Sequence, residues 1–197
     1  MPETIAADLV AEARRYLDTT AATLAALARD EVERLALVSA LLANRLRAGQ
    51  TLFTCGNGGS AADAQHIAGE FVGRFRAERR ALPAVALSTD TSVLTCIAND
   101  YDFERVFARQ VEALVRPGDL LWAFSTSGTS PNVLKAVEAA RRKGARVIPF
   151  TGRANSKLEA SADLCFCADA ALTARSQEIH QLAYHIVCDL VEQSFRE

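Results

Sequence analysis

Hydrophobic and polar positions follow two different spacings along this chain, and together they predict an ordered series of strands and helices. Short apolar runs bounded by glycine, proline or polar residues are typical of buried strands. Such runs occur at 52–55, 83–87, 120–124, 145–150 and 164–167. Segments with apolar residues at helical spacing lie between and after them, at 61–72, 90–96, 103–115, 132–143, 156–161 and 173–195. Repeated strand–helix units predict a three-layer αβα sandwich around a five-stranded parallel sheet.

Two further helical segments precede the first strand. Residues 3–29 and 31–46 are rich in alanine and leucine at helical spacing, and Asp30 between them is a suitable N-cap. We expect an N-terminal helical hairpin over residues 1–48 and an α/β core over 49–197, within one domain. The apolar face of such a hairpin needs a surface to cover it, which predicts a role in subunit contacts.

Composition narrows the class of protein. The chain has 197 residues, is 50% hydrophobic and carries a formal net charge of -2, which argues against a general nucleic-acid or membrane-surface binder. Its five cysteines are odd in number and lie mostly in apolar runs, as expected for reduced thiols in a cytoplasmic protein. Cys165 and Cys167 lack a second pair, so a cysteine zinc site is not expected. We expect neither a membrane span nor a signal peptide.

A glycine-rich turn follows the first strand. Gly56, Gly58 and Gly59 end that strand, and Ser60 is a suitable N-cap for the next helix. Free backbone N–H groups and the helix dipole at this turn predict an anion site at the carboxyl edge of the sheet. A dinucleotide site is not expected, because the next strand does not end in an acidic residue at the usual spacing. The G-K-[ST] sequence of a nucleotide P-loop is also missing.

A second polar loop, at 125–132, follows the third strand. It reads S-T-S-G-T-S-P-N and opens a helix with Pro131 near its first position. Several hydroxyls and free N–H groups converge there, which favours binding of a phosphate monoester through uncharged donors over a plain capped turn. The basic segment 74–80 is interpreted as a solvated connector.

Two distant helices carry all three histidines. His66 and Glu70 lie four residues apart on one helix, and Gln177 and His185 share a broad face of the last helix, with His180 and Tyr184 nearby. By itself an i,i+4 His/Glu pair is often a surface hydrogen bond. The four residues His66, Glu70, Gln177 and His185 together suit zinc or a similar divalent ion. Without metal, the same groups supply a general acid and base.

The motifs, taken together, resemble the phosphoheptose isomerase family of single sugar isomerase (SIS) domains over nearly the whole chain. The matching stretches are 55–71, 87–90, 98–101, 125–133 and 175–185. The resemblance implies a five-stranded parallel sheet, a homotetramer and no nucleic-acid or membrane partner. It implies conversion of sedoheptulose 7-phosphate to D-glycero-D-manno-heptose 7-phosphate through an enediol, the first step of nucleotide-activated heptose biosynthesis.

The resemblance also implies residue roles. Asn57, Gly58 and Gly59 would contact substrate, as would Glu70 and Gln177. The phosphate or its approach would be held by Ser60, Ser125, Thr126, Ser127 and Ser130. Asn99 and Asp100 would line the sugar site. One zinc ion per subunit would be held by His66, Glu70, Gln177 and His185. Glu70 and His185 would also be the acid/base pair, in either order.

Two alternatives stay open at this point. The chain also resembles the DnaA initiator-associating protein, a tetrameric scaffold, but that branch lacks counterparts of Glu70 and His185. An isomerase or sensor for another sugar phosphate would use the same phosphate loops. One departure from the family is the stretch Thr173-Ala174-Arg175, where many relatives carry an aspartate two residues before the arginine.

Overall fold

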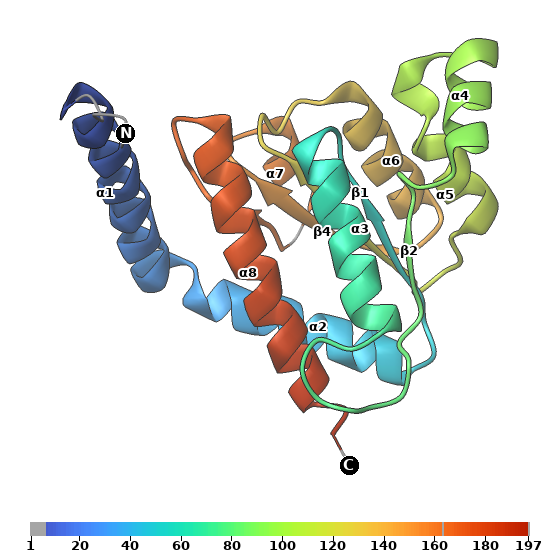
Figure 1. The fold of residues 1–197 in the computed structure, drawn as a ribbon. Coiled ribbons are helices and arrows are strands. Elements are labelled where there is room, and N and C mark those ends of the chain that lie inside the picture. Colours follow the sequence, from blue (N-terminus) through green and yellow to red (C-terminus); the bar gives the residue numbers. More distant parts are fainter. Residues whose placement is uncertain (1–6, 163, 197) are drawn as a thin grey trace, which may run out of the picture.

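A parallel sheet of five strands forms the centre of the molecule in a computed structural model that describes residues 7–162 and 164–196 (Figure 1). The strand order is β2-β1-β3-β4-β5. The strands are β1 (Leu52–Cys55), β2 (Ala84–Ala86), β3 (Leu120–Ser125), β4 (Arg146–Thr151) and β5 (Phe166–Cys167). All four pairings are parallel, which confirms the sheet predicted from the repeated strand–helix pattern.

Helices cover both faces of the sheet, because alternate strand residues point to opposite sides. Trp122 and Phe124 of β3 join one buried cluster, and Leu121 and Ala123 join the other. The first cluster contains the apolar residues of α2 (Val32–Arg47), α3 (Gly59–Val72) and α8 (Thr173–Gln193). The second contains those of α4 (Thr91–Asp100), α5 (Ala108–Leu114), α6 (Pro131–Arg142) and α7 (Lys157–Ala160). The three-layer αβα architecture is therefore confirmed.

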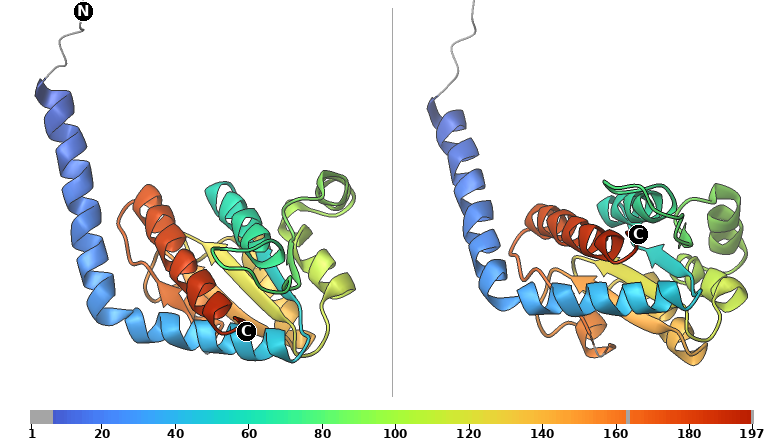
Figure 2. Two further views of the ribbon diagram at one scale, coloured as in Figure 1. Left: turned by 60° about the horizontal axis from the view of Figure 1, so that its bottom comes forward. Right: turned by 90° about the horizontal axis from the view of Figure 1, so that it is seen from below.

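The two N-terminal helices are present, but they do not form the predicted hairpin. α1 (Ala7–Asp30) and α2 meet at an open corner, and α1 projects from the body of the molecule (Figures 1 and 2). Only Glu31 separates them, whereas a reversal into an antiparallel hairpin needs a loop of about two to five residues. Asp30 is the last residue of α1, and α2 begins after Glu31 without a side-chain cap.

Most other element boundaries agree with the pattern. The Asp90 carboxylate caps α4 by accepting a hydrogen bond from the Val93 N–H at 2.9 Å, as expected. α4 then continues to Asp100, four residues beyond the end of the helical segment 90–96 expected from the pattern. The segment from Phe103 divides into a short 3-10 turn, η1 (Phe103–Arg105), and α5. In the described part of the chain, the structure contains no helix with the length and apolar character to span a bilayer.

The strand order creates a switch point between β1 and β3. From β1 the chain crosses to β2 on one side, whereas β3, β4 and β5 succeed one another on the other side. In open α/β sheets of this kind, ligands bind outside the carboxyl ends of the strands at such a point. The two polar loops noted in the sequence follow β1 and β3, so they meet at this position.

Candidate active site at the carboxyl edge of the sheet

The loop after β1 is shaped by its glycines. Gly58 has a φ of +55° and is the N-cap of α3, which begins at Gly59. A Cβ at Gly56 would lie 2.7 Å from the Ser60 carbonyl oxygen, so only glycine fits there. Ser60 is therefore not the N-cap, as the sequence had suggested: it lies buried in the first turn. The Ser60 and Ala61 N–H groups donate within the turn, to the Asn57 and Gly58 carbonyl oxygens at 3.0 Å, so the turn presents the N–H groups of Gly58 and Gly59 at the sheet edge.

The loop after β3 gathers its hydroxyls at one place. The Ser125 Oγ lies 2.9 Å from the Ser130 Oγ and 3.3 Å from the Ser127 Oγ. Ser127 is exposed, Thr126 is half-buried and Ser125 is buried, so the cluster opens toward solvent. Pro131 begins α6, as predicted. This arrangement offers neutral donors at a helix N-terminus, the chemistry that suits a phosphate monoester.

A reciprocal amide pair joins the two loops. The Asn57 Nδ2 donates to the Asn132 Oδ1, and the Asn132 Nδ2 donates to the Asn57 Oδ1, both at 2.8 Å. Asn57 follows β1 and Asn132 lies in the first turn of α6. The pairing partner Asn132 had not been assigned a role from sequence; its position directly after the hydroxyl loop and Pro131 was the available signal.

His66, Glu70 and His185 come together where α3 packs against α8. The His66 Nε2 pairs with the Glu70 Oε1 at 2.9 Å. One ligand atom from each of the three residues lies within 4.8 Å of the others. The His66 and His185 rings meet edge to face with centroids 5.1 Å apart. The His66 and Glu70 side chains are 43% and 19% exposed, so the cluster opens to the surface of the chain.

Tyr184 and Asp63 form a second layer behind His66. The Tyr184 hydroxyl and the His66 Nδ1 are hydrogen-bonded at 2.9 Å, and Tyr184 lies close enough to the Asp63 carboxyl for each to shift the pKa of the other. Burial raises the pKa of Asp63 to about 6, against the opposing effects of Tyr184 and His66. When the Nε2 N–H of His66 donates to Glu70, the Nδ1 accepts from the Tyr184 hydroxyl; when Tyr184 instead accepts from an Nδ1 N–H, the Nε2 carries the lone pair that a metal ligand needs.

Asp63 was not singled out from the sequence, although it lies three residues before His66, on the same side of α3.

The electrostatics of the cluster also follow from its packing. Burial lowers the pKa of His185, the neighbouring His66 lowers it further, and Glu70 opposes both. A neutral imidazole beside a carboxylate can accept a proton or hold a divalent cation.

Three of the predicted residues lie apart from this cluster. Gln177 lies against Gly59, where a Cβ would be 2.3 Å from its Nε2. Gly59 is about two helical turns before His66, so a place for Gln177 among the metal ligands stays a prediction. Asn99 and Asp100 are exposed at the end of α4, where they hydrogen-bond each other at 2.8 Å. Asp100 borders a hollow of about 840 Å³ between β2, α4 and α5.

His180 belongs to the core rather than to the site. It is fully buried, its Nε2 is 3.1 Å from the Thr151 carbonyl oxygen, and its ring packs against Phe124 and Phe150. Burial lowers the pKa of His180 to about 4. It is therefore a neutral core residue that donates to the end of β4.

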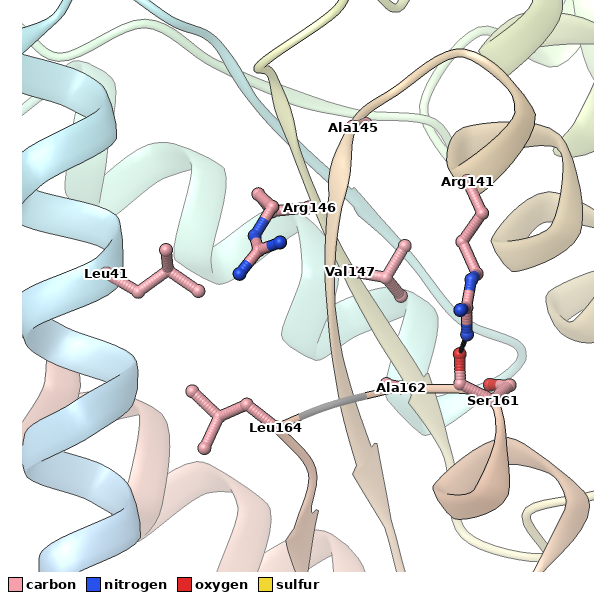
Figure 3. A pocket seen from close by; sticks show the side chains of 8 residues that line it. All are labelled: Leu41, Arg141, Ala145, Arg146, Val147, Ser161, Ala162 and Leu164. Atoms are coloured by element: carbon pink, nitrogen blue, oxygen red, sulfur yellow. Dashed lines mark hydrogen bonds between the residues drawn. The ribbon is translucent and has the colours of Figure 1, made fainter.

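Another hollow lies at the opposite end of the sheet. It has a volume of about 160 Å³ and lies beside the start of β4, with Leu41, Arg146 and Leu164 on its wall (Figure 3). Arg141 closes one side by donating to the Ser161 carbonyl oxygen. Ligands of open α/β sheets bind at the carboxyl edge, so this hollow at the amino edge is not the candidate site.

The fold and the site define a protein of the SIS class, and the family model described as "SIS domain" matches residues 15–152. A phosphoheptose isomerase from Roseiflexus sp. is 51% identical over 93% of this chain and 88% of its own length. One from Geobacter sulfurreducens is 52% identical, over 86% and 90% of the two chains. The solved phosphoheptose isomerase from Neisseria gonorrhoeae is 40% identical with a TM-score of 0.89, covering 94% and 99%. The chain belongs to the phosphoheptose isomerase family.

Proposed function

We propose that this chain converts sedoheptulose 7-phosphate to D-glycero-D-manno-heptose 7-phosphate through an enediol, the first step of nucleotide-activated heptose biosynthesis. The observation that carries the proposal is the approach of Glu70 and His185 to within 4.8 Å in one subunit. The DnaA-associating scaffold alternative is not favoured, because relatives about half identical to this chain are phosphoheptose isomerases.

The two loops and the cluster of His66, Glu70 and His185 have different proposed roles. We assign the phosphate to the N–H groups at Gly58 and Gly59, beside Ser60, and to the hydroxyl loop, which the Asn57–Asn132 pair holds next to this turn. The sugar would then extend along α3 toward His66 and Glu70. Isomerisation moves a proton between C1 and C2, and Glu70 and His185 would take and return it, in an order that we leave unassigned.

The donor set of the cluster fits a divalent ion. Two imidazoles and a carboxylate with ligand atoms within 4.8 Å are the groups that zinc prefers. We propose that His66, Glu70 and His185 hold one zinc ion per subunit, with Gln177 as a fourth ligand. When bound, the ion would polarise the substrate carbonyl. With the ion bound, Tyr184 would accept from the Nδ1 N–H of His66, which leaves its Nε2 unprotonated for the ion.

We infer that the enzyme is a cytoplasmic homotetramer in which the whole chain is one SIS domain. Leu182, Ile186 and Leu190 lie four residues apart on α8 and are 45%, 39% and 38% exposed. This exposed apolar stripe lies on the same helix as His185, which supports a neighbouring subunit as its cover. The five cysteines are free thiols, and Cys55, Cys165 and Cys188 are buried, which supports a reducing compartment.

The decisive experiment is to incubate the purified protein with sedoheptulose 7-phosphate and to follow aldoheptose phosphate by NMR. We expect product to accumulate, to stop after treatment with a chelator, and to resume when zinc is added back. A folded protein that yields no aldoheptose phosphate with added zinc would contradict the proposed function. Full activity after exhaustive chelation would contradict the proposed zinc site alone.

Ser127→Ala tests the phosphate loop. A hydrogen bond to a charged group contributes about 1.5 to 3 kcal/mol, so we expect KM to rise about tenfold or more while kcat changes little. Steady-state kinetics measure both constants. Ser161→Ala, a hydroxyl at the other edge of the sheet, is the matched control and should leave KM unchanged. An unchanged KM in Ser127→Ala would remove this residue from the site.

Tyr184→Phe tests the layer behind His66. The change removes the hydroxyl that is hydrogen-bonded to the His66 Nδ1, and we expect zinc affinity to fall about tenfold because outer-layer partners orient metal ligands. Competition with a chromogenic chelator measures the affinity. Tyr101→Phe, at an exposed tyrosine on the other face of the sheet, is the control. Equal affinities of the two variants would rule out this role for Tyr184.

A further inference from the structure

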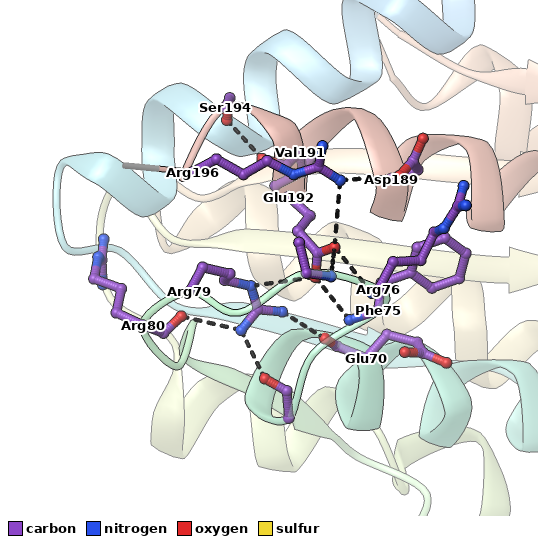
Figure 4. Close-up of polar contacts among 12 residues, drawn as sticks. Glu70, Phe75, Arg76, Arg79, Arg80, Asp189, Val191, Glu192, Ser194 and Arg196 are labelled. Carbon is purple, nitrogen blue, oxygen red and sulfur yellow. Dashed lines mark hydrogen bonds and ion pairs between the residues drawn. The ribbon is translucent and has the colours of Figure 1, made fainter.

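One buried carboxylate holds the segment that links α3 to β2. Glu192, near the end of α8, is only 1% exposed. Its Oε2 accepts a hydrogen bond from the Phe75 N–H at 2.8 Å, and its Oε1 accepts from the N–H groups of Arg76 and Ala77 at 2.9 and 2.6 Å (Figure 4). Three consecutive backbone donors therefore converge on one side chain.

Arg79 extends this contact to the end of α3. Its Nε lies 3.8 Å from the Glu192 Oε2, and its side chain is 2% exposed. Its guanidinium donates to the Glu70 carbonyl oxygen at 2.6 Å and to the Gly73 carbonyl oxygen at 2.8 Å. Arg79 thus satisfies backbone carbonyls at the end of α3 and at its C-cap, Gly73, which have no partner inside the helix. The segment 74–80, expected to be a solvated connector, is instead fixed at Phe75, Arg76, Ala77 and Arg79.

The same segment contacts both members of the proposed acid/base pair. The Phe75 ring lies against His185, with centroids 5.5 Å apart and planes inclined by 36°. His66 meets that imidazole edge to face. Arg79 binds the backbone of Glu70 itself. Glu192 holds Phe75 and Arg79 together, so its carboxylate connects the ring of His185 with the backbone of Glu70.

We propose that Glu192 is a positioning residue of the isomerase, which acts through Phe75 and Arg79 to set the geometry of His185 relative to Glu70. The proposal rests on the proposed function, because it assigns a geometry to the same two groups. A small displacement of reacting groups lowers the rate of the chemical step strongly. The loop at the start of α3 lies about three turns from Glu70, so substrate binding should change much less than turnover.

The test compares Glu192→Gln, Phe75→Leu and the double variant. Glutamine keeps the size of the side chain but presents an amide N–H₂ to donors and removes the charge opposite Arg79. We expect each single variant to lower kcat about tenfold and to change KM less than about twofold. Because Glu192 acts largely through Phe75, the double variant should fall no further than about twofold below the more impaired single variant.

Arg196→Gln is the matched control. Arg196 forms the outer ion pair of the same carboxylate, at 4.0 Å, and does not contact the cluster, so its variant should keep the kcat and KM of the unmodified chain. Side-chain ¹H–¹⁵N spectra of His185 provide a readout of position. We expect its ring signals to shift in Glu192→Gln and in Phe75→Leu, and to stay in place in Arg196→Gln.

Several results would overturn the proposal. A kcat equal to that of the unmodified chain in a folded Phe75→Leu would show that the ring contact does not position His185. Because Phe75→Leu leaves the hydrogen bonds of Glu192 intact, it tests the proposal even if Glu192→Gln does not fold. A double variant about 100-fold impaired would show independent effects. If the unmodified chain does not isomerise the heptose phosphate, the proposed function fails instead. Unmoved His185 signals in both variants would then still refute the positioning role.

Discussion

Glu70→Gln and His185→Ala are each expected to lower turnover by at least about two orders of magnitude, the usual scale for loss of a general acid or base. Glutamine keeps the shape of Glu70 but cannot take a proton, and alanine removes the imidazole that the cluster places within 4.8 Å of it. Neither side chain belongs to the buried core, so both proteins should fold. Initial rates with sedoheptulose 7-phosphate at saturating concentration measure the loss.

The control for this pair is Gln65→Ala, one residue from His66 and exposed on α3. It should keep normal turnover. Circular dichroism and size-exclusion profiles should be the same for all variants, so that a lower rate reports chemistry. Near-normal turnover in either Glu70→Gln or His185→Ala would remove that residue from the acid/base pair, even if the isomerase activity itself is found.

The second large effect is on stability at low pH, through His180. Burial lowers the pKa of this imidazole to about 4, from 6.5 in the unfolded chain. The unfolded state therefore binds more protons between these values, and the free energy of unfolding falls as the pH drops from about 6.5 to about 4. At about 1.4 kcal/mol per pKa unit, the loss attributable to His180 is about 3 kcal/mol.

Denaturant unfolding of His180→Gln at several pH values isolates this contribution. The amide can still donate to the Thr151 carbonyl oxygen but does not titrate in this range. The difference in unfolding free energy between unmodified chain and variant should shrink by about 3 kcal/mol as the pH falls from 7 to 4. Asp63, with its pKa raised to about 6, acts in the opposite direction, since its proton binds more tightly in the folded state. A pH-independent difference would contradict the buried neutral state of His180.

Local patterns in the sequence were sufficient for the sheet and for both loops. Apolar runs bounded by turn residues mark strands directly, and a strand followed by glycines or hydroxyls and then a helix places those groups at the carboxyl edge. His66 and Glu70 also followed from their spacing, since residues four apart on a helix are neighbours. The approach of His185 to them, 115 or more residues later in the chain, was a hypothesis from chemical type, and the structure brings it to this pair.

Other features depend on distant contacts that spacing does not encode. The basic segment 74–80 has the composition of a solvated connector, and only the tertiary structure shows that Arg79 is buried against Glu192. The sequence did contain a signal that Glu192 is buried, because this residue lies on the same face of α8 as the buried Tyr184 and Cys188. A carboxylate at such a position needs a cation and hydrogen-bond donors. The corner at Glu31 likewise depends on how α1 and α2 pack rather than on their helical periodicity.

The outward direction of α1 has a consequence for the order in which this protein gains its structure. Leu9 and Leu17 remain largely uncovered along this helix, and helices in proteins gain most of their stability from packing rather than from intrinsic propensity. The α/β body holds its own two-sided core and can fold first. The outer part of α1 would then depend on docking against another molecule for most of its helical stability, so dilution of the assembly should unwind it before the sheet is disturbed.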